Sequence, residues 1–138
     1  MADITLDGTL ETYRGKTKVL NIVPSLATGV CAASARKFND KAARIPAAVA
    51  LVVSADLPFA MKSFCTTHGL ENVVPLSMMR GRNFAKQYGT LIVDGPFEGI
   101  SARAVVVIDA NDKVVYTQLV REIGNEPDYD AALAAVVK

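Results

Sequence analysis

Five short runs rich in β-branched residues, separated by stretches of helical character, constrain the fold of this chain more than any other feature. The runs cover residues 19–23, 48–54, 73–76, 104–108 and 114–120. Their lengths are typical of β-strands. The order strand, helix, strand, helix, strand, helix, hairpin, helix predicts an α/β fold, in which a central mixed β-sheet carries helices on both faces.

Local start and stop signals place the helices. The predicted helices cover residues 31–44, 56–69, 82–88 and 128–137. Pro46 ends the first, because proline cannot continue a helix. Asp56 is expected to cap the second, with Pro58 in its first turn. Gly89 closes the third, and Asp128 or a near neighbour caps the last.

Two segments read as hairpins. Residues 109–113 form a polar turn between two predicted strands, and residues 4–13 contain the Asp7-Gly8 pair that is typical of a tight hairpin. With the strands and helices above, this pattern predicts a thioredoxin-like arrangement. The absence of a linker or repeat predicts that residues 1–138 form a single domain.

Composition excludes several classes of protein. Of the 138 residues 51% are hydrophobic, which argues against disorder, and the formal net charge is only +1, with no basic block that would suit a nucleic acid. The N-terminus lacks the pattern of a secretory leader, and no apolar run approaches the roughly 18 residues that cross a bilayer. The expected location is cytoplasmic, without a membrane partner.

Cys31 and Cys65 are the only cysteines of the chain. They form neither a CxxC motif nor a disulfide-dense scaffold. Cys65 and His68 lie close in sequence, but the other ligands of a zinc site are missing, so we expect neither a metal nor a cofactor. What remains is a reactive pair or two inert core thiols.

The segment at residues 19–34 favours a reactive Cys31. It runs from a buried strand through a turn containing Pro24 and Thr28 into the first turn of a predicted helix. A helix N-terminus carries partial positive charge and free N–H donors, so a thiol there loses its proton more readily. Cys31 is therefore the candidate nucleophile.

The pattern Pro24-x-x-x-Thr28-x-x-Cys31 resembles the active-site motif of peroxiredoxins. Its surroundings are similar to the thiol peroxidase (Tpx) subfamily of two-cysteine peroxiredoxins, from Arg14 to the C-terminus. The similar blocks lie at residues 18–22, 29–34, 54–60, 64–65, 94–96, 102–109 and 126–129. The resemblance implies a thioredoxin-like fold and a thiol-dependent peroxidase that reduces hydrogen peroxide and organic hydroperoxides.

The resemblance also implies roles for four residues besides Cys31. Thr28 would orient the peroxide, although it could instead cap the helix. Arg103, beside an apolar strand, would stabilise the thiolate and the departing oxygen; the alternative is a solvated arginine at the end of the strand. Pro24 would shield the pocket from water or simply terminate the strand.

The same resemblance matches Cys65 to the resolving cysteine of the subfamily. The alternative is that Cys65 is a buried structural thiol. Attack on peroxide converts Cys31 to a sulfenic acid, which Cys65 would trap as a Cys31–Cys65 disulfide after local unwinding of both helices. The subfamily implies thioredoxin as the reductant and a homodimer formed around the Cys31 loop.

Two features depart from the subfamily pattern. The N-terminal section before the first core strand is short, and Ala27 stands where an aspartate is common. A rival hypothesis follows from the first departure, namely a thioredoxin-fold binding module whose active-site loop is inactivated by the truncation. Peroxide-dependent turnover distinguishes the two hypotheses.

Overall fold

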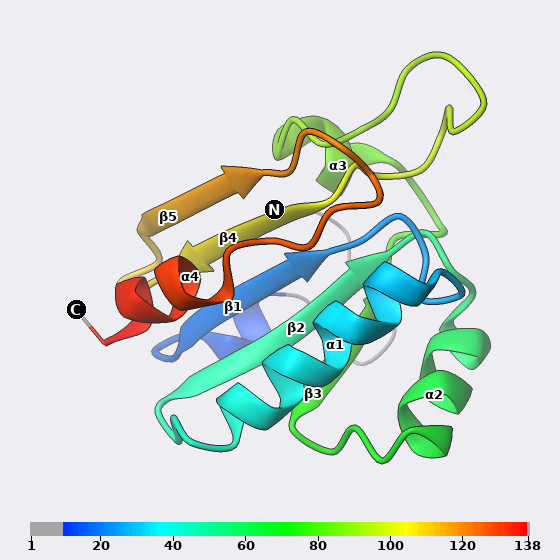
Figure 1. The fold of residues 1–138 in the computed structure, drawn as a ribbon. Helices are drawn as coiled ribbons and strands as arrows, with labels where there is room; N and C mark the ends of the chain where they lie inside the picture. The colour runs from blue at the N-terminus through cyan, green and yellow to red at the C-terminus, as the bar shows by residue number, and fades with distance from the viewer. Residues whose placement is uncertain (1–9, 138) are drawn as a thin grey trace.

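A computed structural model of the chain describes residues 10–137 and contains one five-stranded mixed sheet (Figure 1). The strands are β1 (Thr17–Ile22), β2 (Ala48–Ser54), β3 (Val73–Ser77), β4 (Ala104–Ile108) and β5 (Val114–Leu119), in the spatial order β3-β2-β1-β4-β5. β1, β2 and β3 are parallel, whereas β4 is antiparallel to both β1 and β5. The predicted mixed sheet and the hairpin at residues 109–113 are thus confirmed.

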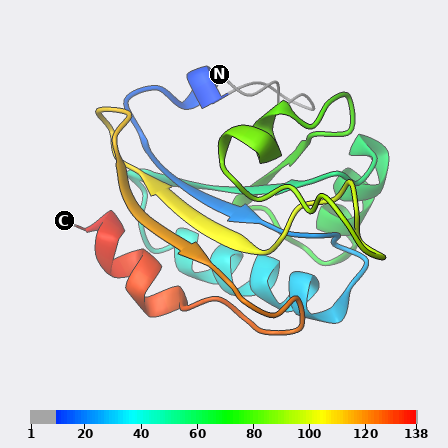
Figure 2. The same ribbon diagram turned by 90° about the horizontal axis from the view of Figure 1, so that it is seen from above.

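Helices cover both faces of the sheet (Figure 2). They are α1 (Gly29–Ala42), α2 (Pro58–Thr67), α3 (Asn83–Gln87) and α4 (Tyr129–Val136). α1 and α4 lie on one face, and α3 lies on the other beside the 3-10 helix η1 (Leu10–Tyr13). The element order and the two-sided covering match the sequence-based prediction.

Two hydrophobic clusters follow from the period-two alternation of the strands. Val19 in β1 and Val23, which directly follows this strand, belong to the cluster that contacts α1, α2 and α4. Leu20 and Ile22 in β1 belong to the cluster that contacts η1 and α3. Successive side chains of a strand point to opposite faces, so a strand buried on both sides is apolar throughout. This explains why the core strands read as continuous apolar runs.

Strand pairing brings several loops to one edge of the sheet. Ile22, at the end of β1, pairs with Val53 near the end of β2 and with Ala104 at the start of β4. The carboxyl ends of parallel strands form the usual position for a functional site in an α/β sheet. The first turn of α1, which carries Cys31, and Arg103, directly before β4, therefore meet there.

The structure corrects several predicted boundaries, mostly by one or two residues. α1 begins at Gly29, two residues before the predicted start, and its N-cap is Thr28. α2 begins at Pro58 with Leu57 as its N-cap and, within residues 10–137, no side chain bonds to this end, so the prediction that Asp56 caps it is wrong. The predicted N-terminal hairpin falls mostly on residues outside the described part, and its last residues, Leu10–Tyr13, form a 3-10 helix rather than a strand.

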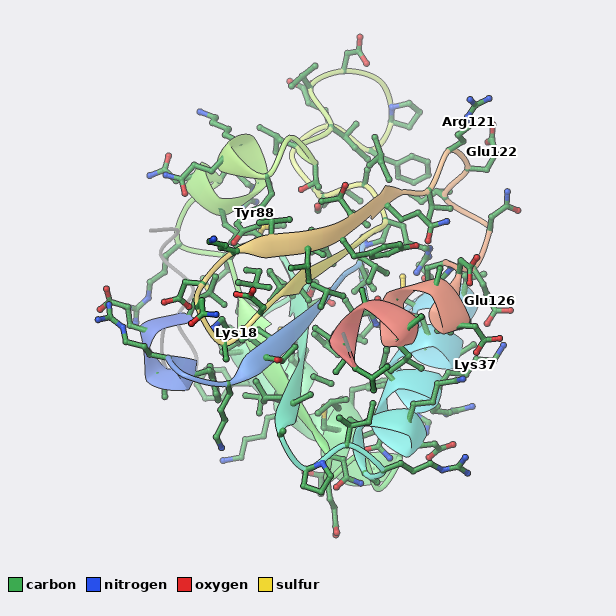
Figure 3. The ribbon with its side chains drawn as sticks, turned by 90° about the vertical axis from the view of Figure 1, so that its left-hand side faces the viewer. Lys18, Lys37, Tyr88, Arg121, Glu122 and Glu126 are labelled. Carbon is green, nitrogen blue, oxygen red and sulfur yellow. The ribbon has the colours of Figure 1, made fainter. Side chains whose placement is uncertain are left out.

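Lys18 is almost fully buried in β1, although it carries a charge. Its Nζ donates to Asp112 Oδ1 at 2.8 Å, in the β4–β5 turn, and to the Lys16 carbonyl at 3.0 Å (Figure 3). The hydrogen bond from Lys18 holds the pKa of Asp112 below its ordinary value. This ion pair ties the start of β1 to the hairpin, away from the Cys31 loop.

Asp128 caps α4, as predicted. Its side chain accepts a hydrogen bond from the Ala131 N–H at 2.9 Å. We expect Asp128→Ala to lower the free energy of unfolding by about 1 kcal/mol, because the amide loses its partner. Urea denaturation measures the change, and Asp128→Asn, which keeps an acceptor, should retain most of the stability. Equal losses in the two variants would contradict the capping role.

Within residues 10–137, no helix has the length and apolar character to cross a membrane.

Candidate active site

Cys31 lies in the first turn of α1, with its side chain fully buried. Its backbone N–H donates to Thr28 Oγ1 at 3.4 Å, and its side chain belongs to the cluster beneath α1. Cys31 is a free thiol. The predicted position at a helix N-terminus is confirmed, and the thiol faces the sheet rather than solvent.

Arg103 directly precedes β4 and reaches the sulfur of Cys31 from there. Residues 103, 105 and 107 share one face by strand alternation, and Val105 and Val107 belong to the cluster that contains Cys31. Arg103 Nη2 lies 3.2 Å from Cys31 Sγ, and the same atom donates to the Ile123 carbonyl at 3.0 Å. The side chain of Arg103 is only 1% exposed, so the alternative of a solvated arginine is wrong.

The guanidinium of Arg103 keeps unused donors beside the thiol. Arg103 Nε and Nη1 are buried and have no hydrogen-bond partner among the described residues. A buried donor without a partner is costly, and native proteins seldom leave one without a functional reason. These N–H groups are available to an oxygen atom that enters next to Cys31.

The turn before α1 holds Thr28 in place. The Val23 N–H still donates to the Val53 carbonyl at 2.9 Å, after which the buried Pro24 starts the turn. Thr28 donates to the Ser25 carbonyl through its N–H and its hydroxyl, both at 3.2 Å. The Thr28 hydroxyl also caps α1, and the residue is exposed, so the capping role and a contact with peroxide do not exclude one another.

Asp56 belongs to the site, although the sequence pattern predicts it to be the cap of α2. Its carboxylate accepts from Ser25 Oγ at 2.7 Å, from the Leu26 N–H at 2.8 Å and from Ser54 Oγ at 2.7 Å. Asp56 thus binds the turn before Cys31 instead of the N-terminus of α2. Its match to a helix-cap pattern hid this long-range contact, which no local signal could reveal.

The loop between β5 and α4 closes over Arg103. Ile123 contributes its carbonyl to Arg103, and Glu126 Oε1 accepts from Lys37 Nζ at 3.0 Å and from the Tyr129 hydroxyl at 2.8 Å (Figure 3). The hydrogen bond from Lys37, followed by that from Tyr129, holds the pKa of Glu126 below its ordinary value. The loop is thereby fastened to α1.

Cys65 lies in the last turn of α2 and, like Cys31, is a free thiol. Its side chain is 9% exposed and belongs to the cluster beneath α1 and α2. Burial raises the pKa of Cys65, which leaves little thiolate near neutral pH. The structure therefore places both cysteines in one apolar cluster but on separate helices.

Comparisons with known proteins agree with this arrangement. Residues 6–133 match the Redoxin family. A thiol peroxidase of Corynebacterium glutamicum is 52% identical over 124 residues, which cover 90% of this chain and 74% of that protein.

Solved structures show the same fold. The crystal structure of a peroxiredoxin-like protein from Aquifex aeolicus superposes with a TM-score of 0.86 at 44% identity, covering 90% of this chain and 72% of that one. A thiol peroxidase from Chromobacterium violaceum gives a TM-score of 0.83 at 27% identity, covering 96% of this chain and 77% of that one. The expected thioredoxin-like fold is confirmed.

The family match, the identity to a curated relative and the shared fold all point to the same conclusion. The chain belongs to the Redoxin family and, within it, to the thiol peroxidases, which are thiol-dependent enzymes that reduce peroxides.

Proposed function

We propose that Cys31 is the peroxidatic nucleophile of this thiol peroxidase. The observation that carries the proposal is the 3.2 Å contact between Arg103 Nη2 and Cys31 Sγ in a site closed to solvent. At this distance the guanidinium can donate a charge-assisted hydrogen bond to a thiolate. Deprotonation is what converts a cysteine into a strong nucleophile.

The proposed first step transfers one oxygen atom. The Cys31 thiolate attacks one oxygen of the hydroperoxide, the O–O bond breaks, and the other oxygen leaves as hydroxide or alkoxide and takes up a proton. The unused N–H groups of Arg103 would stabilise the charge on the departing oxygen. Thr28 would orient the peroxide from the mouth of the turn, and the buried Pro24, which has no N–H, would keep water out.

The proposed second step forms a disulfide. Cys65 loses its proton, its thiolate attacks Cys31 Sγ, and the S–O bond of the sulfenic acid breaks. The hydroxide that leaves takes up the released proton to give water. The two cysteines lie on different helices and Cys65 has a raised pKa, so we expect α1 and α2 to unwind locally before the bond forms. A dithiol reductant of the thioredoxin type then restores both thiols by exchange.

The proposal includes a homodimer that meets around the Cys31 loop. Several loop segments near the Cys31 site carry exposed apolar side chains, and hydrogen bonds connect these segments to one another. Ser77 Oγ donates to the Asp56 carbonyl, next to Leu57, and Arg82 bonds to the carbonyls of Met79 and Gly99. The exposed apolar residues on these segments are Leu57, Phe59, Met79, Val93 and Phe97. Such surfaces are typical of protein interfaces.

The proposal also includes a single domain over residues 1–138. It places the enzyme in the cytoplasm, because its cycle needs a compartment that keeps thiols reduced. The rival hypothesis of a non-catalytic binding module is not favoured, since the match to thiol peroxidases covers 90% of the chain.

The proposed function is tested by an assay with thioredoxin, thioredoxin reductase and NADPH. NADPH consumption should require both a hydroperoxide and thioredoxin, and a protein without peroxide-dependent turnover would contradict the proposal.

Cys65→Ser separates the two steps. We expect this variant to consume about one equivalent of hydroperoxide per chain and then stop, because no thiol resolves the sulfenic acid. Dimedone trapping and intact-mass measurement detect the sulfenic acid on Cys31. Sustained thioredoxin-dependent turnover at the wild-type rate would show that Cys65 does not resolve Cys31.

A further inference from the structure

We propose that Asp56 is a positioning residue for Cys31, a role that rests on the proposed function of Cys31. Asp56 sits at the carboxyl end of β2, between the loop that carries Cys31 and the helix that carries Cys65. All three hydrogen bonds that its carboxylate accepts come from the turn before α1 or from the end of β2. None serves α2 among the described residues, although Asp56 directly precedes the N-cap of that helix.

A continuous hydrogen-bonded path leads from Asp56 to the backbone of Cys31. Ser25 donates its hydroxyl to Asp56 and receives the Ala27 N–H on the same oxygen at 3.1 Å. The Ser25 carbonyl accepts both donors of Thr28, whose hydroxyl in turn accepts the Cys31 N–H. The position of the first turn of α1, and so of Cys31 Sγ relative to Arg103, therefore depends on the Asp56 carboxylate.

Asp56 is itself fixed by the sheet. Its N–H donates to the fully buried Ser54 Oγ at 3.1 Å, and its carbonyl accepts from the fully buried Ser77 Oγ at the end of β3. Two strand ends thus hold the residue independently of α2. Because these contacts do not involve α2, the turn before Cys31 keeps its support while Cys31 is oxidised to the sulfenic acid.

The N-terminus of α2 has no side-chain cap among the described residues, and this bears on how easily the helix that carries Cys65 opens. A capping side chain stabilises the first turn of a helix by bonding to its free N–H groups. Because Asp56 gives both carboxylate oxygens elsewhere, the N-terminus of α2 has no side-chain cap within residues 10–137 and begins with Pro58. The same residue therefore holds the nucleophile in place and leaves the Cys65 helix easier to open.

Asp56→Asn tests the proposal. The amide offers one acceptor oxygen in place of two, so it cannot accept all three bonds. Stopped-flow mixing of reduced protein with hydrogen peroxide measures the second-order constant for Cys31 oxidation, followed by the first-order constant for disulfide formation. We expect the first constant to fall about tenfold to a hundredfold, as a small displacement of reacting groups can produce, and the second to stay within about twofold of wild type.

Two further variants separate positioning from stability. Ile108→Ala removes a buried side chain at the far end of β4, in the cluster on the other face, and lowers the free energy of unfolding without touching the Cys31 turn. It should oxidise at the wild-type rate. Ser25→Ala should reproduce part of the Asp56→Asn loss, and Ser25→Thr, which restores a hydroxyl, should recover it.

The outcomes are distinguishable. Oxidation of Asp56→Asn, or of Ser25→Ala if the former fails to fold, at the wild-type constant would overturn the positioning role while leaving the proposed function intact. An equal loss in Ile108→Ala would also overturn it, because destabilisation alone would then explain the effect. A wild-type protein whose Cys31 does not react with peroxide would instead overturn the proposed function itself.

Discussion

Replacement of Cys31 by serine should reduce thioredoxin-dependent peroxide turnover to the background rate. The hydroxyl is close to the thiol in size and can still accept from Arg103, so the fold and the site should persist. A serine hydroxyl is not deprotonated near neutral pH and does not attack peroxide, so the chemical step is lost. Steady-state NADPH consumption measures turnover, and circular dichroism checks that the variant folds.

The double variant Cys31→Ser/Cys65→Ser is the matched control. It reports how much of any residual peroxide consumption comes from the thiol of Cys65, which is mostly protonated because burial raises its pKa. Substantial activity in Cys31→Ser that disappears in the double variant would make Cys65 the nucleophile. Full steady-state activity in Cys31→Ser would contradict the mechanism.

Arg103→Met should produce the second-largest loss. Methionine fills part of the same buried space but supplies no charge and no N–H donor, so the thiolate loses its contact and the departing oxygen loses its stabilising groups. Removal of one preorganised donor of this kind typically lowers a rate by roughly 10²–10³-fold. We expect a decrease of at least this size in the second-order constant for Cys31 oxidation, measured by stopped flow.

Arg121→Met is the matched control, because Arg121 is an exposed arginine on the same loop as Ile123 (Figure 3). It should oxidise at the wild-type constant. Arg103→Lys should recover little, since an ammonium group carries the charge but lacks the additional Nε and Nη1 donors that lie beside the thiol. Near-normal oxidation in Arg103→Met would show that the contact with sulfur is structural.

The fold was predictable because its signals are local. The strands at residues 48–54 and 104–108 have the same bounds in the structure, since apolar β-branched runs end where polar or turn residues begin. The Asp128 cap was predictable for the same reason. By contrast, the start of α1 moved to Gly29, because the Thr28 hydroxyl caps a helix that the sequence pattern alone starts at Cys31.

The candidate site was only partly predictable. Cys31 and Arg103 come from a sequence motif and a resemblance, and the structure adds the reason that they meet, namely the antiparallel pairing of β1 and β4. Asp56 matched a local cap pattern, yet its carboxylate is used by Ser25 and Leu26, about 30 positions away along the chain. Such contacts depend on strand register, which a single sequence does not encode locally.

The most direct test of the account is to mix the fully reduced protein with one equivalent of hydroperoxide and map its cysteines by peptide mass spectrometry under non-reducing conditions. The account predicts rapid loss of both thiols and a peptide pair linked through Cys31 and Cys65. Two free thiols after prolonged exposure would contradict it and would favour a non-catalytic thioredoxin-fold module.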